Sequence, residues 1–243
     1  MKILSIGNSF SQDAQRYLYE LAKKDGISFK TVNLYIGACT LRTHYLNVLE
    51  NNADYFYEMN GIRTGLKVSI REALASDDWD VITMQQASHE STKIQTYSPY
   101  LEELALHVKK YCPHAKIYIH QTWAYEENSA RLTSIAGYTK AEDMFLDIIK
   151  AYKEAVKTIK ADGLIPSGTA MFNATKLGIG KVHRDTFHAS LGVGRYLLAL
   201  TWYKALTGKN IDDNDFNDFD ECVTDEERKI AIKAVNMAFN NKK

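Results

Sequence analysis

A serine that directly follows the first apolar run of the chain is the strongest candidate for chemistry. Residues 2–6 have the composition of a buried β-strand, Gly7-Asn8-Ser9 ends it, and a helical pattern follows. A serine at the carboxyl end of a central parallel strand points into the crevice where open α/β sheets hold ligands. A glycine before it allows the backbone to turn sharply. We therefore predict that Ser9 is a nucleophile.

Ser9 needs a base, because a serine hydroxyl is too weak an acid to attack unaided. Asp185 and His188 lie three residues apart, so one turn could place the carboxylate against one imidazole nitrogen. The other nitrogen would then face Ser9, which is the arrangement of a serine triad. Taken alone, the same pair has a plain alternative, in which Asp185 caps the next helix and His188 is an ordinary residue of its first turn.

Donors for an oxyanion are expected at the ends of the neighbouring strands. Gly37 follows the second predicted strand and leaves its backbone N–H uncovered, while the polar segment 85–89 follows the third. Each has an ordinary alternative, as a tight turn or a hydrogen-bonded loop. Right-handed crossovers place all of these strand ends on one edge of the sheet. The shared edge therefore favours a functional site.

The elements that must position these residues alternate between apolar β-prone runs and helical patterns, which is typical of parallel βαβ units. We predict a three-layer α/β/α sandwich with a flavodoxin-like, mostly parallel five-stranded sheet in a single domain over residues 1–243. The predicted strands are 2–6, 30–36, 80–84, 116–120 and 164–166, with an accessory strand at 55–60. The predicted helices are 13–25, 41–49, 69–75, 99–111, 140–161, 189–207 and 225–240.

Composition narrows the function classes. The 243 residues contain 30 basic and 30 acidic side chains, so no basic surplus indicates a nucleic-acid partner. Three cysteines without a Cys-x-x-Cys pair argue against a disulfide framework. No apolar run reaches the length of a membrane span. We expect a soluble protein, cytoplasmic as written, and secreted or periplasmic if a leader has been removed.

The order of the polar motifs resembles that of the SGNH, or GDSL-type, hydrolase superfamily. That superfamily carries Gly-Asp-Ser after the first strand, a lone Gly after the second, Gly-x-Asn after the third and Asp-x-x-His near the C-terminus. Gly7-Asn8-Ser9 matches the first block with Asn in place of Asp, and Gly37 matches the second. Asp185-Thr186-Phe187-His188 matches the last block. The third block departs, because Gln86-Ala87-Ser88 stands where Gly-x-Asn is expected.

The resemblance implies roles for these residues. Ser9 would be the nucleophile, His188 the base and Asp185 its orienter, with the N–H groups of Ser9 and Gly37 as oxyanion donors. Carbohydrate-esterase branches use a glutamine in the third block, so we predict Gln86 as the third donor.

Further roles are assigned more loosely. Ser88 would lie behind Gln86, and Trp123 and Tyr125 either stack on a sugar ring or pack in the core or a lid. The expected substrate is a small-molecule or carbohydrate ester with a short acyl group, such as acetyl, and no metal or cofactor is predicted. The alternatives are a lipase or thioesterase of the same superfamily, a flavodoxin-like ligand-binding domain, and a glycan-binding protein without activity. The oligomeric state is left open.

Overall fold

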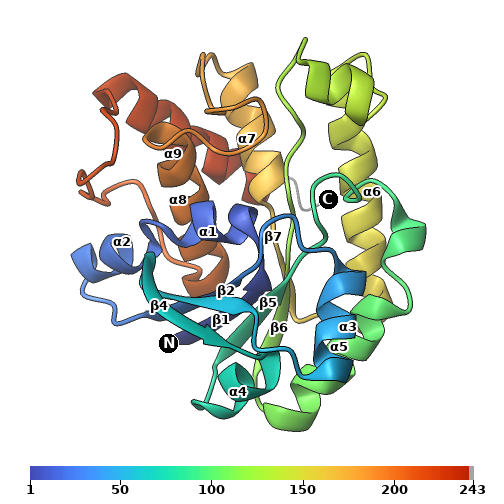
Figure 1. The fold of residues 1–243 in the computed structure, drawn as a ribbon. Helices are drawn as coiled ribbons and strands as arrows, with labels where there is room; N and C mark the ends of the chain where they lie inside the picture. Colours follow the sequence, from blue (N-terminus) through green and yellow to red (C-terminus); the bar gives the residue numbers. More distant parts are fainter. Residues whose placement is uncertain (241–243) are drawn as a thin grey trace.

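A seven-stranded sheet forms the centre of the computed structural model, which describes residues 1–240 (Figure 1). The strand order is β4-β3-β2-β1-β5-β6-β7. The strands from β2 to β7 in this order run parallel, and β3 and β4 are antiparallel to their neighbours. The strands are β1 (Lys2–Gly7), β2 (Lys30–Tyr35), β3 (Tyr55–Met59), β4 (Ile62–Val68), β5 (Val81–Met84), β6 (Lys116–His120) and β7 (Gly163–Ile165).

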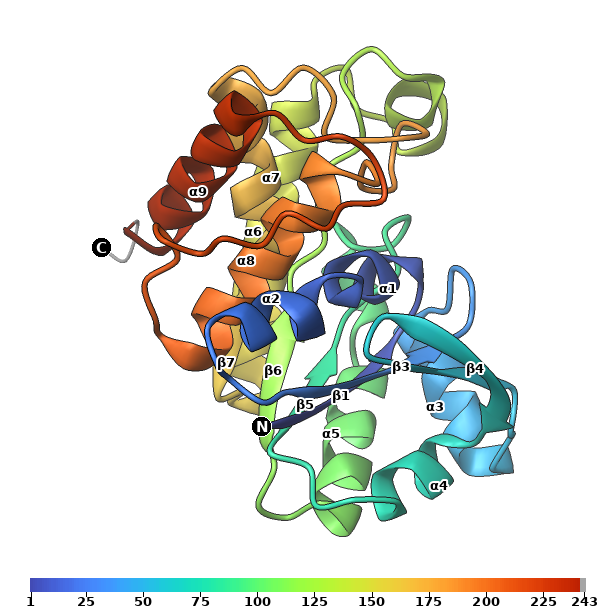
Figure 2. The same cartoon turned by 90° about the vertical axis from the view of Figure 1, so that its left-hand side faces the viewer.

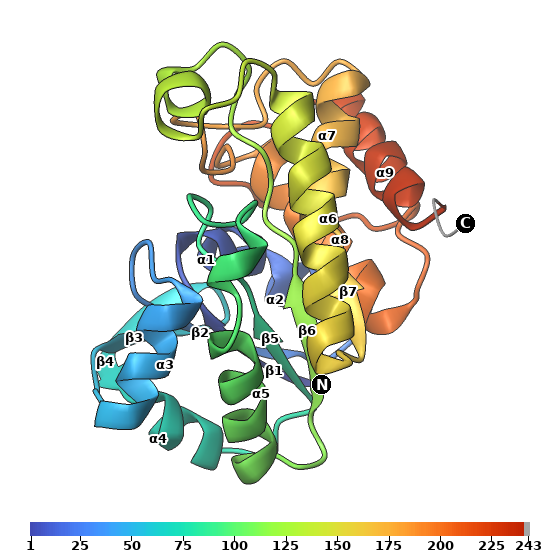
Figure 3. The same cartoon turned by 90° about the vertical axis from the view of Figure 1, so that its right-hand side faces the viewer.

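Helices cover both faces of the sheet, as predicted for a three-layer sandwich. Each face buries its own apolar cluster against the strands, and this burial is the main stabilising contribution. One face carries α1 (Ser9–Gln15), α2 (Leu18–Lys24), α7 (Ser167–Lys176), α8 (Val193–Thr207) and α9 (Asp225–Asn240) (Figure 2). The other carries α3 (Leu41–Glu50), α4 (Ile70–Ala75), α5 (Tyr100–Tyr111) and α6 (Ala141–Ile159) (Figure 3). A short 3₁₀ helix (Ile94–Thr96) precedes α5 in the chain, and a π-helical turn (Arg131–Ile135) precedes α6.

The five predicted parallel strands and the accessory strand predicted at 55–60, which is β3, are confirmed, but the sheet has seven strands instead of the predicted five. A hairpin of β3 and β4 extends the sheet beyond β2. Its turn is Asn60-Gly61, both with positive φ, as the hairpin type with two such residues requires. β4 was missed because it is an edge strand that faces solvent along nearly its whole length. Arg63 and Lys67 on this edge are the charges that protect an open strand from pairing.

Two helix boundaries also differ from the prediction, and both differences concern the site. The predicted helix 13–25 is two helices, and the first begins at Ser9. Asn8 caps it, because its Oδ1 accepts a hydrogen bond from the Phe10 N–H at 3.0 Å. The predicted helix 189–207 begins only at Val193, because the preceding residues form a loop. Within residues 1–240, no helix has the length and apolarity needed to cross a bilayer.

Candidate active site

Ser9, His188 and Asp185 form one chain of hydrogen bonds. The His188 Nε2 lies 2.8 Å from the Ser9 Oγ, and the His188 Nδ1 lies 2.7 Å from the Asp185 Oδ2. The other carboxylate oxygen of Asp185 accepts the backbone N–H of His188 at 2.9 Å. Because the Nδ1–H group donates a hydrogen bond to the carboxylate, Nε2 is unprotonated and its lone pair faces the serine hydroxyl. This is the arrangement that activates a serine.

Asp185, the carboxyl group of this hydrogen-bonded triad, is held as an anion. Partial burial raises the pKa of Asp185, but the hydrogen bonds from the side chain and the backbone of His188 lower it by more. The net effect is a pKa below the usual value of an aspartate. Asp185 is therefore charged at neutral pH and can stabilise an imidazolium on His188.

The loop that carries Asp185 and His188 folds back on itself. His183 and Ala189 form an isolated antiparallel bridge, and the Arg184 N–H donates to the His188 carbonyl at 3.0 Å. Thr186 at the tip has a φ of +73°, a left-handed conformation that a residue other than glycine adopts at a cost. The narrow loop projects the imidazole toward α1, where Ser9 begins the helix.

A buried carboxylate ties this loop to α1. Asp13 is fully buried and accepts hydrogen bonds from Arg184 Nη1 at 2.9 Å on both oxygens. The Arg195 Nε donates to the same carboxylate at 2.9 Å, and the Ala189 N–H at 3.2 Å. Arg195 also pairs with Asp220 at 2.7 Å. The histidine loop is therefore attached to the helix that starts with the serine.

A pocket of about 350 Å³ opens over the triad. Of the predicted site residues it includes Ser9, Gly37, Ser88, Tyr125 and His188. As the first residue of a helix, Ser9 has a backbone N–H without an intrahelical acceptor. The pocket is also lined by His89, from the polar segment after β5, and by six residues to which no role was predicted: Asn8, Phe10, Tyr35, Ala38, Arg131 and Phe187.

The prediction that Gln86 is the third oxyanion donor is wrong. Its side chain is fully buried away from the pocket, and its amide N–H₂ donates to the hydroxyl and the carbonyl of Thr96. Its Oε1 accepts the backbone N–H of Leu41 at 3.0 Å and that of Ala87 at 2.9 Å. Gln86 therefore joins the start of α3 to the loop after β5, and it has no donor left for a substrate.

Ser88, which the motif register placed at the position of the asparagine, lies in the pocket wall instead. The Tyr125 hydroxyl donates to the Ser88 Oγ at 3.1 Å, so the proton of Ser88 is free to point elsewhere. Trp123 is fully buried and is not a stacking platform in the Ser9 pocket. Its ring stacks on Phe10 with centroids 4.1 Å apart, and its N–H donates to the Phe187 carbonyl at 2.7 Å. Trp123 therefore packs against α1 and supports the loop that carries Asp185 and His188.

Beneath Ser9, buried polar side chains at the ends of three strands are joined in a row. Asn8 Nδ2 donates to the Cys39 carbonyl at 3.2 Å, and Asn8 Oδ1 accepts from Gln85 Nε2 at 2.8 Å. Gln85 Oε1 accepts from His120 Nδ1, and His120 Nε2 accepts from the Ser167 hydroxyl at 3.0 Å. Burial lowers the pKa of His120 to about 3, so every member of the row is neutral at physiological pH.

This row explains the asparagine at position 8. Its amide oxygen accepts from the Phe10 N–H and from Gln85, while its amide nitrogen donates to the Cys39 carbonyl. An aspartate could accept the first two hydrogen bonds but has no proton for the third. Asn8 therefore links the serine turn to the loop that carries Gly37.

We expect the protein to lose stability as the pH falls from about 6.5 toward 4.5. Burial lowers the pKa of His44 and of His120 to about 3 and that of His183 to about 4, against 6.5 for an unperturbed histidine. Between the folded pKa values and 6.5, the unfolded chain binds protons that the folded chain does not. The free energy of unfolding therefore increases with pH and reaches its full value above about 6.5. Urea unfolding midpoints measured from pH 7.5 to 4.5 test this.

Two variants sharpen the pH experiment. His183→Gln can keep the hydrogen bond to the Ala124 carbonyl, now 3.1 Å long, without a titratable ring. It should show a shallower decline than the wild type. The exposed His114 is the matched control, because His114→Gln should leave the decline unchanged. A constant midpoint in the wild type over this range would contradict the expectation.

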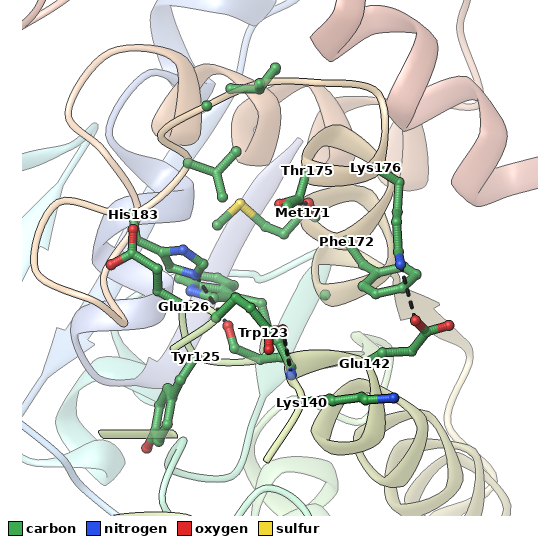
Figure 4. A pocket seen from close by; sticks show the side chains of 17 residues that line it. Trp123, Tyr125, Glu126, Lys140, Glu142, Met171, Phe172, Thr175, Lys176 and His183 are labelled. Carbon is green, nitrogen blue, oxygen red and sulfur yellow. Dashed lines mark hydrogen bonds and ion pairs between the residues drawn. The ribbon is translucent and has the colours of Figure 1, made fainter. Parts of the chain in front are cut away.

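A second, larger cavity of about 570 Å³ lies behind the segment 123–127 (Figure 4). Met171 and Phe172 form part of its apolar wall, and Lys176 pairs with Glu142 at 3.0 Å on its rim. Tyr125 lines both cavities, but Ser9 and His188 do not border the larger one. The triad therefore faces the smaller pocket.

Comparison with solved structures defines the class of fold. A candidate SGNH hydrolase from Slackia heliotrinireducens has a TM-score of 0.60 at 22% identity, over 85% of this chain and 98% of that chain. A family 3 carbohydrate esterase of Clostridium thermocellum has a TM-score of 0.53 at 11% identity, over 86% and 96%. The chain therefore has the SGNH-hydrolase fold, with Gly7-Asn8-Ser9 at the end of its first strand.

A family model also matches the chain. The model of a domain of unknown function, DUF4886, matches residues 2–238, and the chain belongs to this family. A crystal structure of a DUF4886 family protein from Bacteroides uniformis has a TM-score of 0.91 at 35% identity, over 99% of this chain and 95% of that chain. No curated protein matches the chain in sequence.

Proposed function

We propose that this protein is a serine esterase that removes a short acyl group, such as acetyl, through an acyl-enzyme on Ser9. The observation that carries the proposal is the continuous chain from Ser9 Oγ through His188 to Asp185, with contacts of 2.8 and 2.7 Å. A flavodoxin-like binding domain has no use for such a chain. The pocket of about 350 Å³ over Ser9 favours a short acyl group over a long one.

The reaction follows from this geometry in two balanced steps. The Ser9 Oγ attacks the ester carbonyl carbon while its proton moves to His188 Nε2, and the bond to the leaving alcohol then breaks as that proton moves to the alcohol oxygen. Water attacks the acyl-enzyme next and gives one proton to Nε2. That proton returns to Ser9 Oγ as the carboxylic acid leaves.

Three donors are suited to the oxyanion of both steps. Two are the backbone N–H groups of Ser9 and Gly37, both of which border the pocket. The third is the hydroxyl of Ser88. Its oxygen accepts a hydrogen bond from the Tyr125 hydroxyl, so its own proton is free to donate to the oxyanion. Ser88 thus takes the role that the superfamily gives to an asparagine. A carbohydrate as the alcohol part of the ester is consistent with the similar fold of the family 3 carbohydrate esterase of Clostridium thermocellum.

A fluorophosphonate probe tests the proposal without knowledge of the natural substrate. The probe phosphonylates only an activated serine, so we expect one label per chain, mapped to Ser9 by peptide mass. Ser9→Ala and His188→Ala should not be labelled. Ser28→Ala, a change of an exposed serine before β2, should label like the wild type. Absence of labelling together with no turnover of p-nitrophenyl acetate would instead support a binding domain.

A further inference from the structure

Arg131 lies in the wall of the pocket over Ser9 without an acidic partner among the described residues. Arg131, at the start of the π-helical turn, is half-buried and borders the same pocket as Ser9 and His188. Its guanidinium lies over the ring of Phe187, 3.7 Å from the centroid, and 5.7 Å from that of Tyr125. Stacking on an aromatic face orients a guanidinium while leaving its N–H edge free to bind.

Arg131 differs from the other arginines of the chain. Within residues 1–240, its side chain has no hydrogen-bond acceptor and no carboxylate within ion-pair distance. The two other arginines without a carboxylate partner among the described residues, Arg42 and Arg71, are exposed. The remaining five, Arg16, Arg63, Arg184, Arg195 and Arg228, each pair with an acidic side chain.

The pocket itself offers this cation no acidic partner. Among the described residues, those that border the pocket include no aspartate or glutamate. The acid of the triad, Asp185, is already occupied by two hydrogen bonds from His188. A partly desolvated guanidinium attracts an anion more strongly than a solvated one, and its planar fork matches a carboxylate. The position therefore suits an anionic group of a ligand held over Ser9.

We propose that the substrate of this enzyme carries a carboxylate close to the scissile ester and that Arg131 binds it. The proposal rests on the esterase function proposed above and specifies its substrate class. Arg131 is a specificity-determining residue in this account, and it takes no part in proton transfer. A pocket of about 350 Å³ holds a single small ligand, so one substrate can contact the guanidinium and the serine together.

Paired esters in which a neutral group replaces the carboxylate test the proposal. On the alcohol side, 3-acetoxybenzoate is compared with 3-acetoxybenzamide. On the acyl side, the mono(4-nitrophenyl) ester of glutarate is compared with 4-nitrophenyl pentanoate. We expect the wild type to prefer the charged member of at least one pair by about tenfold or more in kcat/KM, as for one hydrogen bond to a charged group. Rates of Ser9→Ala are subtracted as background.

Three variants separate recognition of charge from packing. Arg131→Gln should abolish the preference, mainly through a higher KM for the charged ester, and change the neutral ester far less. Arg131→Lys, which keeps the charge and loses the fork, should retain part of the preference. Arg42→Gln, a change of an exposed arginine without a partner, should retain all of it. If Arg131 only supported Phe187, both esters would slow equally and the ratio would stay constant.

The outcomes distinguish the two proposals. If Ser9-dependent hydrolysis occurs with no preference for either charged ester, or with the same preference in Arg131→Gln, the carboxylate proposal is overturned and the esterase proposal stands. If the wild type hydrolyses none of the four esters and the fluorophosphonate does not label Ser9, both are overturned. A preference that falls in 0.5 M NaCl for the wild type but not for Arg131→Gln supports the electrostatic origin.

Discussion

Ser9→Ala and His188→Ala should each lower kcat for p-nitrophenyl acetate by about 10³-fold or more, as expected for members of a serine triad. In the proposed mechanism Ser9 supplies the atom that forms the covalent bond, and His188 Nε2, 2.8 Å away, is the base that removes its proton. Among the described residues, Ser88 and His89 also line the pocket, but neither has a hydrogen bond to Ser9 or His188 that could replace this contact. Steady-state rates with matched thermal unfolding curves provide the measurement.

The same experiment has internal controls. Residues that act as one unit do not add, so the double variant of Ser9 and His188 should be no slower than either single variant. Asp185→Asn should lose less activity than these, because it orients the imidazole and does not react. Ser28→Ala should match the wild type. Turnover by Ser9→Ala at the wild-type rate would exclude the serine mechanism.

Asp13→Ala should lower the free energy of unfolding by about 3–5 kcal/mol, the cost of removing one partner from a buried ion pair. The carboxylate is fully buried, and its removal leaves Arg184 and Arg195 without their shared partner. The backbone N–H of Ala189 loses its acceptor as well. Because Arg184 lies within the histidine loop, kcat should fall together with stability. Urea unfolding monitored by fluorescence gives the first quantity.

Asp220 provides the matched comparison. It also pairs with Arg195, at 2.7 Å, but its side chain is 26% exposed. Solvent weakens such a pair, so Asp220→Ala should cost no more than about 1 kcal/mol. Equal decreases in the free energy of unfolding for the two variants would show that burial does not determine how much the ion pairs of Asp13 stabilise the protein.

The sequence was sufficient for the parts of the molecule that depend on local patterns. Buried parallel strands are continuous apolar runs, so β1, β5 and β6 could be located from composition alone. The motifs at Ser9 and at Asp185 are short, and each keeps its residues within one turn. Their meeting across the chain followed from the rule that parallel strands end on one edge of the sheet.

The features that the sequence did not predict depend on hydrogen-bond partners and neighbours that are distant in the chain. Gln86 and Ser88 are both polar residues after β5, and only the neighbours Leu41 and Thr96 decide that Gln86 turns away from the pocket. Arg131 lies in a long segment between β6 and α6, and no local pattern reports that such a segment passes over the catalytic loop. β4 has the solvent-facing pattern of an edge, which resembles that of a loop.

The row of side chains beneath Ser9 limits how this site can change over time. A backbone carbonyl only accepts, so Cys39 dictates which way Asn8 must face. Asn8 dictates the orientation of Gln85, and Gln85 that of His120. A residue of the right size but the wrong polarity leaves two donors or two acceptors opposed at its boundary. Single substitutions in this row should therefore rarely be tolerated, whereas combined substitutions that restore every donor–acceptor pair should be. The residues beneath Ser9 are thus expected to change together during evolution.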